Sequence, residues 1–257
     1  MKNNKSLGQH WLKNRAILDQ IAALAARDAD SDTVCLEIGP GLGTLTSSLL
    51  KRFTKVVAVE YDERLAANLP KSFPGKNLTV IRDDILDSDI PKLVQTDNYV
   101  VVGNIPYYIT SPIVQKLIRL SPTPQAIVLL MQKEVAERIA AVAGNHSLLS
   151  LTVQSWAESE LGPAVLGAEF TPPPKVDSQV LILHPLVEPL LTAAGLNLAT
   201  RGFKSPRKKL ASNLADSDHS KADWQQIFSD FNLNPDARAA DLTIWDWNQL
   251  AEHIAKS

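Results

Sequence analysis

The sequence Glu37-Ile38-Gly39-Pro40-Gly41-Leu42-Gly43-Thr44 says more about the architecture of this 257-residue chain than any other segment. It continues the apolar, β-branched run Thr33–Ile38, which is typical of a buried strand. Glycines directly after a strand allow a tight turn and let the backbone approach a ligand closely. The helix expected next presents its unpaired N–H groups at the same point. The motif therefore predicts a strand, a turn and a helix, with a ligand site at the carboxyl end of the strand.

Strand-like runs alternate with helix-like segments from about residue 33 to residue 131. The strand-like runs are Thr33–Ile38, Lys55–Glu60, Leu78–Arg82, Tyr99–Gly103 and Ala126–Met131. Apolar residues recur at helical spacing in Thr44–Phe53, Asp62–Leu69 and Ser111–Leu120. This alternation predicts a parallel sheet with helices on both faces.

Two further strand-like runs, Leu148–Trp156 and Gln179–His184, are joined through the proline-rich segment Phe170–Lys175. With the first five runs they predict a seven-stranded, Rossmann-like α/β sheet whose last two strands form an antiparallel edge hairpin. After about Pro189 the strand-like runs end, and short helices with polar breaks follow. We therefore expect a large domain over residues 1–187 and a small helical domain over residues 188–257.

Composition limits the class of protein. Hydrophobic residues make up 45% of the chain and charged residues 21%, as in an ordinary globular protein. The longest aliphatic run, Ala126–Met131, is too short to span a bilayer, and the N-terminus lacks an apolar signal core. The single cysteine, Cys35, favours a reducing compartment, and the histidines show no metal-ligand spacing. We therefore expect a cytoplasmic protein with no membrane segment and no metal.

The net charge is only −2, but basic residues without neighbouring acids gather in two segments, residues 1–18 and residues 201–210. The basic residues are Lys2, Lys5, Lys13 and Arg15 in the first segment and Arg201, Lys204, Arg207, Lys208 and Lys209 in the second. Electrostatic attraction depends on charge within a Debye length, so these segments can bind nucleic-acid phosphates despite the low net charge. Composition alone favours the interpretation that both basic segments are simply solvated. Only the chemistry of the predicted site can make RNA binding the favoured interpretation.

The spacing of the glycines separates two classes of cofactor. A dinucleotide fingerprint would place its third glycine at position 44, which is Thr44. The third glycine is instead Gly43, one position earlier. Such a turn suits the amino-acid part of S-adenosylmethionine, which would contact Gly39 and Gly41. Glu60 ends the next strand-like run, where a carboxylate can accept both ribose hydroxyls. Asp84 follows the third run and can accept from an adenine amino group, so we expect S-adenosylmethionine as the cofactor.

The fourth strand-like run ends in Asn104-Ile105-Pro106-Tyr107. An adenine amino nitrogen is a poor nucleophile because its lone pair is delocalised into the ring. The side-chain oxygen of Asn104 and the carbonyl of Ile105 could each accept one amino hydrogen and localise that lone pair. Pro106 constrains the backbone, and Tyr107 offers a flat face for an extruded base. The motif therefore predicts catalysis by orientation and fixed dipoles.

Four further motifs, together with the glycine turn and the Asn104–Tyr107 motif, are spread over nearly the whole chain. They are Ser6-Leu7-Gly8-Gln9-His10-Trp11-Leu12, Met131-Gln132-Lys133-Glu134-Val135-Ala136-Glu137-Arg138, Phe170-Thr171-Pro172-Pro173-Pro174-Lys175-Val176-Asp177-Ser178 and Phe203-Lys204-Ser205-Pro206-Arg207-Lys208-Lys209-Leu210. With these motifs the chain resembles the ribosomal RNA adenine dimethylases, and closely the KsgA-type small-subunit branch. The resemblance implies a class I methyltransferase domain with a basic N-terminal arm, followed by a helical RNA-binding domain. It also implies conversion of two adjacent adenines near the 3′ end of small-subunit (16S) ribosomal RNA to N6,N6-dimethyladenosine.

The resemblance also assigns individual residues. The implied cofactor contacts are His10, Leu12, Gly39, Glu60, Asp84 and Asn104, and the implied target-base contacts are Asn104, Tyr107 and Phe170. Phe170 could close a stacking sandwich around the base opposite Tyr107. The RNA contacts expected from local charge are Lys5, Lys13, Arg201, Lys204, Arg207, Lys208 and Lys209. The chain departs from the family pattern at Trp11, at His146-Ser147 and at Pro206, none of which belongs to the Asn104–Tyr107 motif.

Several other functions remain to be weighed. A sister branch of the family methylates large-subunit ribosomal RNA and has a different glycine turn. A non-catalytic ribosome assembly factor would also bind the immature small subunit, but it would not need an intact site. A DNA adenine methylase lacks support because no sequence-reading domain is recognisable, and a nicotinamide dehydrogenase fails at Thr44. We therefore expect an active, monomeric enzyme with small-subunit ribosomal RNA as its partner.

Overall fold

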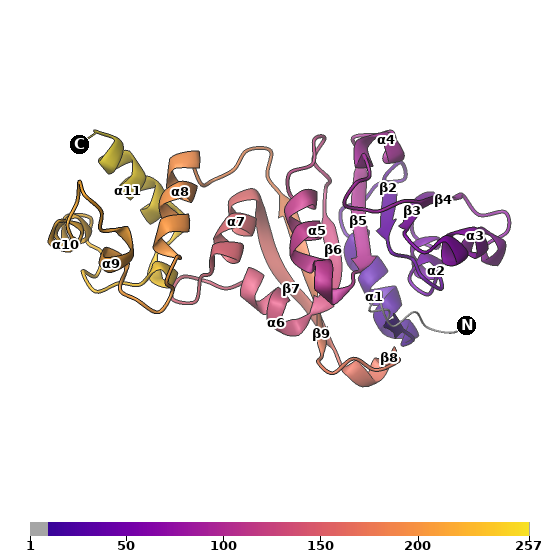
Figure 1. Ribbon diagram of the computed structural model, residues 1–257. Coiled ribbons are helices and arrows are strands. Elements are labelled where there is room, and N and C mark those ends of the chain that lie inside the picture. The colour runs from indigo at the N-terminus through magenta and orange to yellow at the C-terminus, as the bar shows by residue number, and fades with distance from the viewer. Residues whose placement is uncertain (1–9, 257) are drawn as a thin grey trace. The chain divides into compact units, whose positions relative to one another are not determined.

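The computed structural model describes residues 10–256, which form two compact units (Figure 1). The first unit comprises the chain up to Glu137 together with Ala157–Val187. The second comprises Arg138–Trp156 and the chain from Glu188 onward. The segment Arg138–Trp156 thus groups with the second unit, although it lies inside the range 1–187 expected for the first domain. No helix within residues 10–256 is long and apolar enough to cross a membrane.

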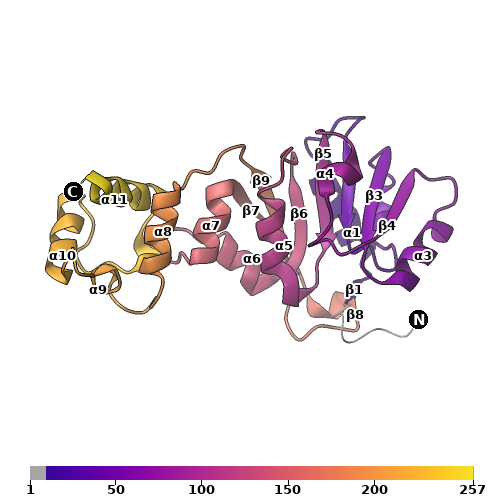
Figure 2. The same ribbon diagram turned by 45° about the horizontal axis from the view of Figure 1, so that its top comes forward.

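The first unit is built on a seven-stranded sheet in the order β4-β3-β2-β5-β6-β9-β7 (Figures 1 and 2). Its strands are β2 (Val34–Ile38), β3 (Lys55–Glu60), β4 (Leu78–Arg82), β5 (Tyr99–Asn104), β6 (Ile127–Gln132), β7 (Ala157–Val165) and β9 (Ser178–Pro185). The first five are parallel, while β9 pairs antiparallel with both β6 and β7. Ile38 lies opposite Val59 and Gly103, so the carboxyl ends of neighbouring strands meet at one edge. This sheet confirms the predicted fold class.

One of the seven predicted strands is wrong. Leu148–Trp156 is not a strand but helix α7, and the strand that pairs with β9 is Ala157–Val165. Two contacts explain the helix: the hydroxyl of Ser147 accepts from the N–H of Ser150 at 3.1 Å, as a helix N-cap does, and Leu151 packs in the core of the second unit. The β-branched residues of the segment therefore pack on a helix face, which overrides their strand preference.

Helices cover the sheet and bring the chain from one strand to the next. They are α1 (Arg15–Ala25), α2 (Thr46–Leu49), α3 (Glu63–Ser72), α4 (Ile90–Val94), α5 (Thr110–Leu117) and α6 (Lys133–Ile139). Side chains of Asn14 and Asp62 cap the N-termini of α1 and α3. Helix α2 is much shorter than the predicted span Thr44–Phe53, since the glycine turn extends to the residues before it. A core cluster joins α1 to alternate residues of the central strands, including Val100, Val102 and Val128.

The second unit is helical beyond Glu188, as the end of the strand-like runs after about Pro189 predicts. It contains α8 (Ala193–Gly202), α9 (Leu210–Leu214), α10 (Lys221–Asp230) and α11 (Ile244–Lys256) together with α7. Trp224, Phe228 and Trp247 are fully buried in its core. Gly202 is required there, because an added Cβ would lie only 2.5 Å from the Trp247 ring.

Candidate active site

A pocket of about 300 Å³ lies at the carboxyl ends of β2, β3, β4 and β5. In a doubly wound sheet this is the position where ligands bind. The pocket brings together nine of the residues predicted from sequence: His10, Gly39, Gly41, Glu60, Asp84, Asn104, Ile105, Pro106 and Tyr107. Residues as far apart in sequence as His10 and Tyr107 therefore share one cavity, and the site can be described wall by wall.

The glycine turn after β2 forms the first wall. Gly39, Gly41 and Gly43 have φ values of +61°, +57° and +79°, a backbone conformation that side chains with a Cβ strongly disfavour. A Cβ at Gly43 would lie 2.6 Å from Leu69 Cδ1, whereas a Cβ at Gly39 would meet no atom within 4 Å. Gly43 is thus needed for packing, while Gly39 leaves bare backbone and open space at the pocket.

Glu60, at the end of β3, ties this turn to the start of the next helix. One carboxylate oxygen accepts from the N–H of Gly41 at 3.0 Å, and the other accepts from the N–H of Asp62 at 2.8 Å. Burial raises the pKa of Glu60, and the N–H groups of Asp62 and Gly41 oppose that rise. The carboxylate therefore holds the pocket wall in place and also lies on the pocket surface.

Glu37, near the end of β2, is a buried acid with no role predicted from the sequence. Its side chain is 1% exposed and does not line the pocket, and Oε2 has no hydrogen-bond partner among the described residues. Burial raises its pKa to about 8, and the negative charge of Glu60 contributes to that rise. Glu37 is therefore mostly protonated at neutral pH.

The loop after β4 forms another wall. Asp84 Oδ1 accepts from the N–H of Leu86 at 2.9 Å, and no hydrogen bond of the described residues uses Oδ2. Asp83 accepts at Oδ1 from the N–H of Asp84 and at Oδ2 from the hydroxyl of Ser88, at 2.9 and 2.6 Å. Sequence reasoning missed Asp83, Tyr61 and Tyr108 as pocket residues, although each directly neighbours a residue that it selected.

Asn104 lies at the end of β5 with its amide orientation determined by a contact. Its Nδ2 donates to the backbone carbonyl of His10 at 3.0 Å. Because a carbonyl can only accept, the amide nitrogen must face His10, and Oδ1 remains an acceptor on the other side. The geometry thus provides the acceptor that the predicted role of Asn104 requires.

Tyr107 contacts His10 and the last sheet strand. Its ring stacks against the His10 ring with centroids 5.9 Å apart and planes inclined by 22°. Its hydroxyl lies 2.9 Å from Ser178 Oγ, and burial raises its pKa. His10 Nδ1 is in turn 2.7 Å from the carbonyl of Pro172. The N-terminal segment and the proline-rich loop therefore meet beside the tyrosine.

Two predicted site residues do not reach the pocket. Leu12 and Phe170 lie opposite each other in the short antiparallel ladder of β1 (Trp11–Leu12) and β8 (Phe170–Thr171), and they are 1% and 3% exposed. Both belong to the core cluster under α1. The predicted sandwich of Phe170 and Tyr107 is therefore not formed in this structure, because the phenyl ring is packed in the core.

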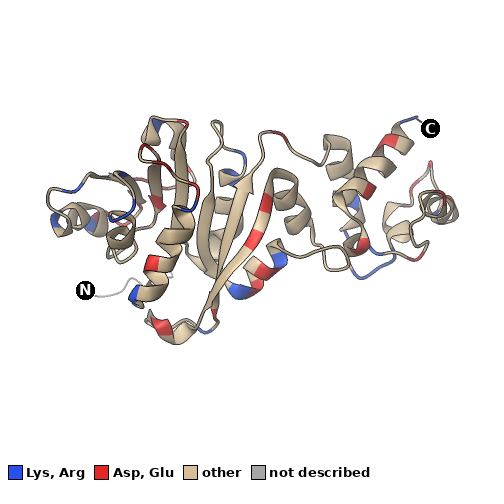
Figure 3. Cartoon of the chain, turned by 180° about the vertical axis from the view of Figure 1, so that it is seen from behind, with Lys and Arg blue, Asp and Glu red and all other residues tan. Residues whose placement is uncertain are grey.

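The basic residues predicted to bind RNA differ in their surroundings. Lys5 lies outside the described residues, and Lys13 is exposed on the N-terminal segment. In the second unit, Arg201 pairs with Asp216 at 2.5 Å and Lys209 pairs with Asp236 at 2.6 Å. The remaining three, Lys204, Arg207 and Lys208, are exposed and form no ion pair within residues 10–256. Figure 3 shows how lysine and arginine are distributed along the ribbon of each unit.

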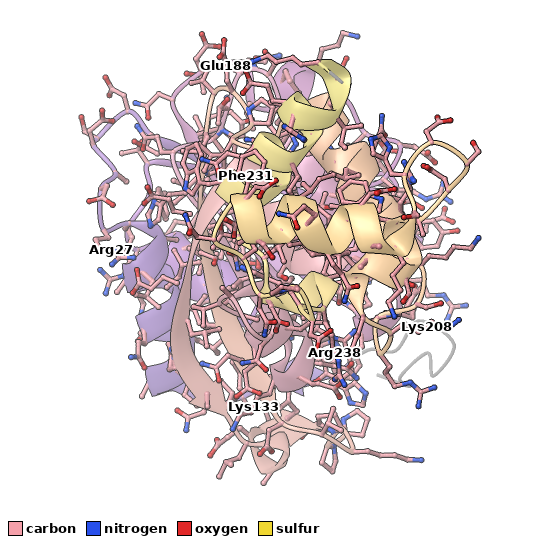
Figure 4. All side chains as sticks on the ribbon, turned by 90° about the vertical axis from the view of Figure 1, so that its left-hand side faces the viewer. Arg27, Lys133, Glu188, Lys208, Phe231 and Arg238 are labelled. Atoms are coloured by element: carbon pink, nitrogen blue, oxygen red, sulfur yellow. The ribbon has the colours of Figure 1, made fainter. Side chains whose placement is uncertain are left out.

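The loop that carries these three cations is attached to a second loop. The N–H of Leu210 donates to the carbonyl of Ala237 at 2.7 Å, which places Lys208 and Arg238 on neighbouring surface loops of the second unit (Figure 4). Arg238 is not among the residues predicted from sequence, and Asp236 and Asp241 lie close to it along the chain. The exposed cations of this loop remain the strongest candidates for phosphate contacts.

Comparison with known proteins gives consistent results. Residues 1–256 match the family described as "Ribosomal RNA adenine dimethylase". A relative from Gloeobacter violaceus, "Ribosomal RNA small subunit methyltransferase A", is 42% identical over 98% of this chain and 94% of that protein. The crystal structure of a dimethyladenosine transferase from Plasmodium falciparum has a TM-score of 0.80 at 30% identity, covering 96% of this chain and 98% of that one. The crystal structure of the 23S rRNA methyltransferase ErmE has a TM-score of 0.77 at 28% identity, covering 95% of this chain and 99% of that one.

Proposed function

Because this chain belongs to the ribosomal RNA adenine dimethylase family, we propose that it methylates two adjacent adenines in the 3′-terminal hairpin of 16S ribosomal RNA. The product is N6,N6-dimethyladenosine, and the methyl donor is S-adenosylmethionine. The observation that carries the proposal is that the glycine turn, Glu60 and Asp84 share one pocket with the Asn104–Tyr107 motif. We further propose that the enzyme acts as a cytoplasmic monomer on the immature small subunit.

The residues of the pocket fit S-adenosylmethionine. The bare backbone at Gly39 leaves room for the amino-acid part of the cofactor. Glu60 can accept from the ribose hydroxyls, and the free Oδ2 of Asp84 can accept from the adenine amino group. When bound, the cofactor supplies an electrophilic methyl group on a sulfonium. The leading contribution of the protein is then to place the substrate nitrogen in line with that group.

The Asn104–Tyr107 motif supplies this placement. Before the first transfer, Asn104 Oδ1 and the Ile105 carbonyl each accept one amino hydrogen of the target adenine and direct its lone pair toward the donor. Each transfer replaces one N–H by N–CH₃ and releases a proton, so before the second transfer one hydrogen remains for one of these acceptors. Tyr107 presents its ring to the base, and burial raises the pKa of its hydroxyl. These acceptors are oriented before the substrate arrives, so no reorganisation is needed during the reaction.

Removing the Glu60 carboxylate should weaken cofactor binding more than it slows turnover at saturating cofactor. We expect Glu60→Ala to lose about 1.5–3 kcal/mol of affinity for S-adenosylmethionine, as for a charge-assisted hydrogen bond. Calorimetric titration measures this loss. Glu63→Ala, at an exposed position in the following helix, is the matched control and should bind normally. If Glu60→Ala binds S-adenosylmethionine with undiminished affinity, a group other than Glu60 makes the ribose contact.

Reversing charge on the second-unit loop should weaken RNA binding in a salt-dependent way. We expect the double variant Arg207→Glu/Lys208→Glu to bind small-subunit RNA less tightly. The slope of log K against log salt should fall by about one unit for each lost phosphate contact. The charge-matched control Lys221→Glu/Lys256→Glu changes two lysines of the same unit outside this loop. An unchanged salt slope in Arg207→Glu/Lys208→Glu would show that this loop is not part of the RNA interface.

The sister activity on 23S ribosomal RNA is the main alternative, since the ErmE structure is also similar. The deciding experiment offers labelled S-adenosylmethionine with undermethylated small subunits, large subunits and naked RNA, and identifies the modified nucleoside by mass spectrometry. We expect dimethyladenosine in the small-subunit RNA. Methylation of the large subunit alone would select the alternative, and binding without methyl transfer would indicate an assembly factor.

A further inference from the structure

Lys116 connects two walls of the pocket without lining it. It lies in α5, one helical turn after Ile113, which does line the pocket. Residues three apart on a helix share a face, so Lys116 extends from the same side of α5. Its ammonium donates to the backbone carbonyls of Leu86 at 2.8 Å and Ser88 at 2.6 Å.

These two carbonyls belong to the loop that carries the Asp84 wall. Asp83, Asp84, Ile85 and Leu86 all line the pocket. The hydrogen bonds of Asp83 and Asp84 described above satisfy donors within the loop and determine its shape. The Lys116 bonds differ in kind, because they join the loop to α5. This helix follows the Asn104–Tyr107 motif after a 3-10 turn at Tyr107–Ile109.

An ammonium suits this position for physical reasons. It has three N–H donors and no acceptor, so a single lysine can bridge two carbonyls. Hydrogen bonds from a charged donor are shorter and stronger than those between neutral groups. Without the lysine, the two carbonyls would lack these donors in a partly buried setting, and the loop would relax away from α5.

We propose that Lys116 is a positioning residue that sets the affinity for S-adenosylmethionine by holding the Asp83–Leu86 wall at a defined distance from the Asn104–Tyr107 motif. This inference rests on the proposed function. It adds a residue that belongs to none of the sequence motifs and does not line the pocket. The adenine end of the cofactor is the part that depends on Lys116, since Asp84 is the group on the held loop.

The test uses the variant Lys116→Met, which keeps the aliphatic stem and removes the three donors. We expect the Kd for S-adenosylhomocysteine, measured by calorimetry, to rise about tenfold, in proportion to the loss of charge-assisted hydrogen bonds. The kcat at saturating S-adenosylmethionine should stay within about twofold, because the Asn104–Tyr107 motif is untouched. The control Lys92→Met removes a lysine that pairs with Asp89, next to the same loop, and should leave the Kd unchanged.

The outcome separates positioning from a merely structural role. A lower Tm with an unchanged Kd in Lys116→Met overturns the inference. Lys116→Arg keeps the charge and N–H donors and should retain more affinity than Lys116→Met, and equal losses in the two variants also overturn it. Should Lys116→Met fail to fold, Lys116→Gln, which keeps one amide donor group, replaces it under the same criterion. If the unsubstituted protein binds no S-adenosylhomocysteine, the proposed function itself fails instead.

Discussion

Replacing Asn104 by alanine should lower the turnover of adenine methylation by about 10²–10³, the cost of removing one preorganised hydrogen-bonding group from a transition state. The variant loses the Oδ1 acceptor that would hold one hydrogen of the target amino group. It also loses the Nδ2 donor to the His10 carbonyl. The second loss loosens the N-terminal segment beside the pocket, so cofactor affinity should fall as well, but less than turnover.

Single-turnover kinetics with saturating S-adenosylmethionine separate these two effects. Calorimetry on the same variant gives the change in cofactor affinity. Asn68→Ala makes the same chemical change on the exposed face of α3, where Nδ2 donates only to the Arg64 carbonyl, and it should react normally. Near-normal turnover in Asn104→Ala would refute the role of Asn104 in catalysis.

Replacing Glu37 by glutamine should remove a loss of stability that the unsubstituted protein shows as the pH rises. Burial raises the pKa of this carboxyl from an ordinary value of 4.5 to about 8 in the folded state. Between these two values the group is protonated when folded and ionised when unfolded, so unfolding releases a proton and higher pH favours unfolding. The free energy of unfolding should therefore fall by up to about 1.4 kcal/mol per pH unit across this window.

Urea unfolding of the two proteins at about pH 5 and pH 8 tests this expectation. Relative to the unsubstituted protein, Glu37→Gln should gain up to about 4 kcal/mol between these pH values, because the amide stays neutral throughout. The control Glu158→Gln changes an exposed acid on β7 that water solvates in both states. Parallel pH–stability curves for the Glu37→Gln variant and the unsubstituted protein would show that Glu37 is ionised in the folded protein.

The fold was predictable where local sequence and tertiary environment demand the same structure. Interior strands such as Lys55–Glu60 are buried on both faces, so they appear in the sequence as continuous apolar runs. Leu148–Trp156 is also apolar and partly β-branched, yet it forms a helix. Short apolar runs of this kind fit either structure, and the Ser147 cap with the core of the second unit decides between them.

The candidate site likewise contains residues whose position the sequence predicts and residues whose position only the tertiary structure decides. Strand ends in a parallel sheet must meet at one edge, so the glycine turn, Glu60, Asp84 and Asn104 could be placed together from their order alone. Phe170 could not be placed, because a loop aromatic can face either a pocket or the core, and here it packs in the core. Lys204, Arg207 and Lys208 are exposed, whereas Arg201 and Lys209 pair with acids from distant segments.

The amino-acid sequence alone thus determined the sheet class, the glycine turn, the strand-end carboxylates and the position of the Asn104–Tyr107 motif at a strand end, since each depends on residue type and short-range order. Only the tertiary structure decided that Glu60 accepts from the N–H of Gly41 in the turn, that the His10 carbonyl orients Asn104, and that Lys116 holds the Asp84 loop. Each of these contacts joins groups 19 to 94 positions apart. No local pattern records such pairs, because they depend on how the packed core brings distant backbone groups within hydrogen-bonding distance.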